Sequence, residues 1–145
     1  MRAEILAPAA VLVLWTLVML GWLAATRIPA IGGVRGLLRA QPGRRGQDLE
    51  TVLPARLNWK SHNYTHLTEQ PTLFYATSMI LALMGAGRID VALAWTYVAL
   101  RIVHSLWQAL VNRVAVRFAL FNLSSACLVV LAIRAAMACF ATVGR

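Results

Sequence analysis

The sequence predicts an all-α integral membrane protein built as a four-helix bundle. Of its 145 residues, 60% are hydrophobic and only 13% are charged, whereas about a quarter of an average soluble domain is charged. The apolar residues gather into blocks of roughly 20, the length that crosses the hydrocarbon core of a bilayer. These blocks lie at about 5–25, 71–86, 91–111 and 119–143. We therefore expect a single membrane domain over residues 1–145.

The first span, 5–25, is predicted to stay in place as a transmembrane helix. Its apolar run is longer than a typical signal-peptide core, and no small-residue cleavage site follows it. A basic loop is expected at 26–54, with a short surface turn of helix at 34–38. Several residues of this loop should interrupt any longer helix: Gly32, Gly33, Gly36, Pro42, Gly43 and Gly46.

Residues 55–85 are predicted to form one long helix, polar at first and then apolar. Pro71 lies inside it, so a kink or a restart is expected there. A tight turn over 85–90 leads to the third span. A short polar link, which carries Arg113 and Arg117, then precedes the fourth.

The distribution of cations predicts the orientation in the membrane. Seven of the fourteen Lys and Arg residues lie between residues 26 and 60, and the third link adds two more. The turn at 85–90 has only Arg88, which Asp90 opposes. By the positive-inside rule, the first and third connectors face the cytoplasm and both termini lie outside. A topology signal of this kind explains the net charge of +9 without a nucleic-acid partner.

Polar residues concentrate where the second helix begins and the third ends. Arg101, His104, Gln108 and Asn112 share one stripe of the third span, so this face should meet protein or water. Glu69 on the neighbouring helix is the predicted partner of Arg101, because an unpaired arginine at mid-span is costly. The surrounding residues would complete a basic pocket for an anionic, amphipathic ligand. They are Asn63, His66, Arg113 and Arg117, together with His62.

The sequence supports two other kinds of site less well. A metal site is one alternative, because helical spacing places three possible ligands on one face, His62, His66 and Glu69, and His104 could be a fourth. The nearby cations and the lack of a second acidic ligand argue against metal binding. The serines have no assignable Asp–His relay. Cys127 and Cys139 are expected to be small buried hydrophobes.

Three motifs in this region resemble the MAPEG superfamily (membrane-associated proteins in eicosanoid and glutathione metabolism), and its bacterial members in particular. They are Glu69-Gln-Pro-Thr-Leu-Phe, Arg101-Ile-Val-His104, and Asn112-Arg113 followed by Arg117-Phe118. The resemblance covers roughly 56–134.

The resemblance implies a homotrimer in the bacterial inner membrane that binds glutathione between subunits, near the cytoplasmic side. Glu69, Arg101 and His104 would match family positions on the second and third helices. Arg117 would match the arginine that stabilises the glutathione thiolate, since a nearby guanidinium lowers a thiol pKa. The chain departs from the family pattern at two positions. His66 stands where family enzymes usually have Asn, and Gln108 stands where glutathione enzymes tend to have Tyr.

Two functions therefore remain open. One is a glutathione-dependent transferase or peroxidase for lipophilic electrophiles, with Arg117 as the catalytic residue. The other is a non-catalytic membrane relative that binds a lipid and keeps Glu69 and Arg101 as a structural clasp.

Overall fold

The computed structural model describes residues 3–33 and 45–143, and over this part of the chain all of the regular structure is helical. The prediction of an all-α protein is confirmed. The elements are α1 (Leu6–Gly33), the short 3₁₀ helix η1 (Gly46–Thr51), α2 (Ala55–Glu69), α3 (Pro71–Met84), α4 (Arg88–Leu110) and α5 (Val114–Val143).

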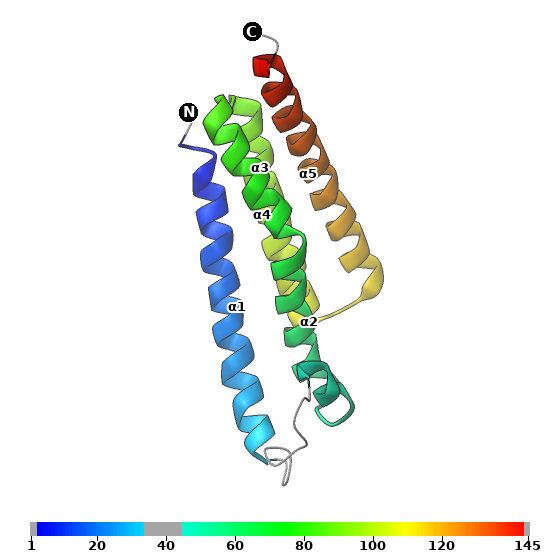
Figure 1. Cartoon of the computed structure of the whole chain (residues 1–145). Coiled ribbons are helices and arrows are strands. Elements are labelled where there is room, and N and C mark those ends of the chain that lie inside the picture. The colour runs from blue at the N-terminus through cyan, green and yellow to red at the C-terminus, as the bar shows by residue number, and fades with distance from the viewer. Residues whose placement is uncertain (1–2, 34–44, 144–145) are drawn as a thin grey trace.

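The helices run lengthwise beside one another, with α3 following α2 along nearly the same line (Figure 1). The closest packing joins α4 to α5, and further contacts join α3 to α5 and α1 to α2. We call the end with η1 and the 111–113 link the loop end. The opposite end, with both termini and the turn between α3 and α4, is the far end (Figure 1).

The outer surface is strongly apolar. Among the described residues, three helices are long and apolar enough to cross a membrane: α1, α4 and α5. Large hydrophobic side chains point outward along them and along α3, as at Leu14 (63% exposed), Leu83 (72%) and Phe140 (76%). A soluble protein rarely exposes so much contiguous apolar surface, and a lipid environment accounts for it. With 14 residues, α3 is about 21 Å long and is too short to cross the hydrocarbon core alone.

The first helix is longer than predicted. The basic loop was expected to begin at residue 26, but α1 continues to Gly33 and includes Pro29. Contacts with the neighbouring segments support the extra turns. Arg27 donates hydrogen bonds to the Ser61 hydroxyl and the Gly46 carbonyl, and the Lys60 ammonium lies over the Trp22 ring. These tertiary contacts outweigh the helix-breaking tendency of proline and glycine.

The remaining loop holds an element that the sequence did not predict. The turn expected at 34–38 lies outside the described residues. The helix η1 begins where the Asp48 carboxylate accepts a hydrogen bond from the Arg45 N–H (2.8 Å). The Asn58 side-chain amide then donates to the Glu50 and Leu53 carbonyls (3.0 and 3.2 Å), which holds this segment against the start of α2.

The predicted restart at Pro71 is confirmed. Proline takes the first position of α3, where its missing N–H costs nothing. Gly85 ends α3 in the left-handed conformation (φ 100°), which glycine adopts without strain. Asp90 then accepts a hydrogen bond from the Gly87 N–H (2.8 Å), so it caps the first turn of α4 rather than lying in the turn before it.

The link between α4 and α5 is shorter than predicted. It comprises residues 111–113, and α5 starts at Val114 instead of residue 119. Arg117 therefore lies in the first turn of a helix, which fixes the direction of its side chain. Asn112 makes this tight link possible, because it adopts a left-handed conformation (φ 54°) that asparagine tolerates better than most residues.

Candidate functional site

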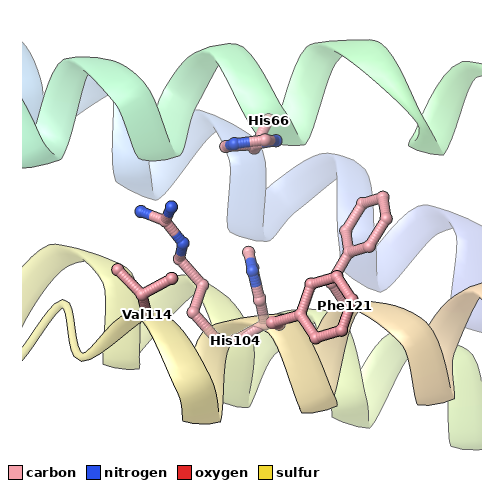
Figure 2. A pocket seen from close by; sticks show the side chains of 6 residues that line it. His66, His104, Val114 and Phe121 are labelled. Carbon is pink, nitrogen blue, oxygen red and sulfur yellow. The ribbon is translucent and has the colours of Figure 1, made fainter.

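A cavity of about 170 Å³ opens at the loop end, between α2, α4 and the start of α5 (Figure 2). Each of these helices contributes side chains that point into it, including His66 from α2, His104 from α4 and Phe121 from α5. Its lining residues are His66, His104, Val114, Arg117, Phe118 and Phe121. Of the predicted site residues, three line this cavity: His66, His104 and Arg117.

Aromatic rings form most of the wall. The His66 and His104 rings meet edge to face, with centroids 6.1 Å apart and an angle of 84° between their planes. The Phe121 ring lies 6.4 Å from His66 and 6.3 Å from His104. The Phe121 ring thus packs near both imidazoles, and both histidines line the cavity (Figure 2).

Burial affects the protonation of His66, which lies on α2, between the predicted first and second spans. Loss of hydration lowers the pKa of His66 below its usual 6.5. The positive charges of Arg101 and Arg117 also lower this pKa, whereas the negative charge of Glu69 raises it. His66 is therefore neutral at pH 7 and can either donate or accept a hydrogen bond in the cavity.

Arg117 is held in place by the preceding link. Its Nη1 donates to the Asn112 Oδ1 (2.8 Å), and Asn112 is itself fixed because its N–H donates to the Trp107 carbonyl (2.7 Å). The guanidinium has five N–H groups. One bond to Asn112 orients it and leaves the others available for a ligand in the cavity.

The polar stripe of α4 is buried, as predicted. Arg101, His104 and Gln108 are 0%, 2% and 0% exposed. Arg101 Nη2 donates to the His66 carbonyl (2.6 Å), and its guanidinium lies 5.8 Å from the centre of the Phe121 ring. The Nε and Nη1 atoms of Arg101 have no hydrogen-bond partner among the described residues.

The predicted ion pair between Glu69 and Arg101 does not form within one chain. Instead, Glu69 Oε2 lies 3.6 Å from His66 Nδ1, and the Glu69 side chain is 62% exposed. Glu69 is the last residue of α2, and its side chain turns outward there. The His66 carbonyl takes the place beside Arg101 that was predicted for the Glu69 carboxylate. Carbonyls near a helix C-terminus carry partial negative charge and therefore attract a cation.

The other predicted site residues fall into two groups. Asn63 lies fully buried, and neither its side-chain amide atoms nor those of Gln108 have a partner among the described residues. Arg113 is exposed on the link and is not part of the cavity wall. Sequence reasoning missed Val114, Phe118 and Phe121. Phe121 lies one helical turn after Arg117 and therefore on the same face of α5, which is the only feature of the sequence that places it near the site.

The metal hypothesis lacks its ligand set. No group of three His, Cys, Asp or Glu side chains that could hold a metal ion occurs in the part of the chain that the structure describes. His62, which the hypothesis required, instead pairs with Glu50 (2.8 Å) on η1.

The apolar exterior and the helical architecture define an integral membrane protein. The chain belongs to the MAPEG family, whose family model matches residues 5–137. The match includes the cavity and the buried polar stripe. No curated protein matches the chain, and no solved structure does.

Proposed function

We propose that this chain is a glutathione-dependent membrane transferase or peroxidase that acts on lipophilic electrophiles. The observation that carries the proposal is the placement of Arg117 at a cavity beside two histidines, with its guanidinium oriented by Asn112. A cation at this position lowers the pKa of a neighbouring thiol and so supplies thiolate at neutral pH. The apolar wall, which includes Phe118 and Phe121, suits a lipophilic second substrate.

Glutathione is an anionic tripeptide, and the residues near the cavity have the chemistry to bind it. Arg101 has two unused guanidinium nitrogens that can bind a carboxylate, and buried amides can hydrogen-bond the peptide groups. Glu69 can bind the ammonium group, and His104 can donate to the peptide. The remaining proposed contacts are Asn63, His66, Gln108, Asn112 and Arg113.

The size of the cavity supports a site shared between subunits. Ligand sites usually enclose about 300–1,000 Å³, whereas one chain offers about 170 Å³ here. A second copy of the chain would enlarge the enclosure and cover the exposed carboxylate of Glu69. We therefore propose a homotrimer with the site between adjacent subunits.

We further propose four membrane spans, the second at about residues 71–86, with the polar helix α2 continuing it beyond the hydrocarbon core. The loop end would face the cytoplasm of a bacterium, and both termini would lie outside the inner membrane. Support comes from the cations that flank the loop end, including Arg27, Arg45 and Arg56.

Thiolate formation tests the proposed function directly. Ultraviolet absorbance of thiolate should rise when glutathione is added to the purified full chain in detergent at pH 7. Arg117→Ala should reduce this signal about tenfold, because one pKa unit changes the thiolate fraction by that factor. Arg56→Ala removes an exposed cation at the same end and is the matched control. No saturable glutathione signal from the wild-type chain would contradict the proposal.

The second candidate is a non-catalytic relative that binds a lipid. His66 and Gln108 at the two departing positions favour it. In one chain its clasp cannot be the pair of Glu69 and Arg101, which do not meet. A glutathione conjugation rate clearly above the rate without protein would exclude this candidate.

A further inference from the structure

The far end holds a second cavity, of about 330 Å³, that has no part in the proposed glutathione chemistry. It lies between the last turn of α3, the first turn of α4, and the part of α5 that runs past the α3–α4 turn (Figure 1). Its lining residues are Leu81, Gly85, Gly87, Asp90, Arg134, Met137 and Ala138. We call it the far-end cavity.

An ion pair forms the polar wall of the far-end cavity. Arg134 donates from Nε to Asp90 Oδ1 and from Nη2 to Asp90 Oδ2, the second at 3.3 Å. Asp90 also accepts from the Gly87 N–H, and its side chain is 4% exposed. The carboxylate thus accepts three hydrogen bonds, two of which hold the arginine in a fixed direction.

The arginine keeps donors that this pair does not use. Its side chain is 40% exposed, and its Nη1 makes no hydrogen bond to any residue within 3–33 or 45–143. Arg134 interrupts an otherwise apolar stretch of α5, between Ile133 and Ala135. Because α4 begins at the same level with Arg88, this arginine lies where a membrane span meets the headgroup layer. The acceptor abundant at that depth is the phosphate of a phospholipid.

We propose that the far-end cavity binds the phosphate of an anionic phospholipid headgroup, with Arg134 as the donor and Asp90 as the residue that positions it. The cavity volume falls within the range of small-ligand sites. Met137 and Leu81 line its apolar part and contact the glycerol and upper acyl region. This inference goes beyond the proposed function, because the site lies at the opposite end of the bundle from Arg117.

Lipid binding to the full chain in a non-ionic detergent tests the proposal. Native mass spectrometry would count bound phosphatidylglycerol across a titration and would compare it with diacylglycerol of the same acyl chains, which lacks the phosphate. Phosphatidylglycerol should bind with saturation, and diacylglycerol about tenfold more weakly, since a charge-assisted hydrogen bond is lost. Equal binding of the two lipids would overturn the proposal.

Three variants locate the site. The double change Asp90→Asn with Arg134→Gln removes both charges while keeping hydrogen-bonding side chains, and it should weaken phosphatidylglycerol binding about tenfold. Met137→Phe should also weaken binding by filling the cavity, and it leaves both charges in place if the double variant fails to fold. Arg88→Gln, an exposed cation at the same end, should change binding less than about twofold. Wild-type affinity in both cavity variants would overturn the assignment.

A competition experiment distinguishes a lipid site from a site for soluble phosphate. Glycerol 3-phosphate carries the same charged group without acyl chains. It should compete only weakly with phosphatidylglycerol. Complete displacement of the lipid by glycerol 3-phosphate at equal concentration would contradict the lipid assignment. Glutathione thiolate formation should be unchanged in Met137→Phe, so failure here and failure of the proposed function can be told apart.

Discussion

Arg101 and Arg134 both lie on helices that are apolar enough to span a membrane, yet their surroundings differ. Arg134 makes two hydrogen bonds to the carboxylate of Asp90, and part of its side chain remains exposed. Arg101 is completely buried and makes one hydrogen bond to a backbone carbonyl. No carboxylate of the described residues lies within 4 Å of it. Arg134 therefore has a counter-charge in the same chain, whereas the site around Arg101 is electrostatically incomplete among the described residues.

This difference indicates different roles. A paired charge fixes how two helices pack, and the Asp90–Arg134 pair joins the start of α4 to α5. A buried cation with unused donors is costly unless something outside the chain completes it. Asn63 on α2 and Gln108 on α4, the helix of Arg101, also have side-chain amides without partners among the described residues. The loop end therefore keeps buried polar groups for a ligand or a neighbouring subunit to complete. At the far end the Asp90–Arg134 pair stabilises helix packing and leaves one arginine nitrogen for the proposed lipid phosphate.

The largest effect should follow from breaking the far-end pair. Arg134→Met leaves the Asp90 carboxylate buried with only the Gly87 N–H as a partner, and we expect the free energy of unfolding to fall by about 3 kcal/mol. Equilibrium unfolding in detergent micelles measures it. Adding Asp90→Asn to this variant should recover most of the loss. If Arg134→Met costs less than about 1 kcal/mol, the pair is not the structural element described here.

The same change at the other arginine should have the opposite outcome. Arg101→Met removes a buried cation that lacks a counter-charge, so the free energy of unfolding should stay within about 1 kcal/mol of the wild type or rise. Glutathione binding, measured by calorimetry, should be lost. A destabilisation as large as that of Arg134→Met would show that Arg101 is structural too, and the contrast between the two regions would disappear.

The sequence predicted the parts of this contrast that depend on local pattern. Helical periodicity located the buried stripe of Arg101, His104 and Gln108, and the proline at position 71 located the restart of the helix. Local pattern could not predict the direction of the Glu69 side chain at the end of α2, because packing between helices decides that direction. The Asp90–Arg134 pair joins residues 44 positions apart, and counting charges assigned Asp90 to its sequence neighbour Arg88 instead.

Helix ends were harder to predict for a related reason. Gly32 and Gly33 predicted a break, yet Arg27 donates hydrogen bonds to Ser61 and Gly46, and α1 stays helical to Gly33. Only the polar half of the cavity lining was predicted from the sequence. Its polar residues stood out in the sequence because charges are rare in spans, whereas Phe121 looked like any other lipid-facing residue.

The smallest effect concerns the protonation of His66 at the incomplete site. Burial lowers the pKa of His66 below 6.5, so below that pH the unfolded chain binds more protons than the folded chain. The contribution of His66 to stability is therefore complete above about pH 6.5 and declines as the pH falls toward its lowered pKa. The charged or titratable groups that act on it are Glu69, Arg101, Arg117 and His62.

Replacing His66 by Asn removes this titration and keeps a hydrogen-bonding side chain. Between about pH 7.5 and pH 5.5 the wild-type Tm should fall by up to about 2 °C more than that of His66→Asn, a small difference because His66 is only half-buried. Comparing the two proteins at both pH values cancels the titration of every group they share. An equal fall in Tm for both would mean that His66 is solvated like an ordinary surface histidine, and that the cavity is more open to water than its aromatic wall indicates.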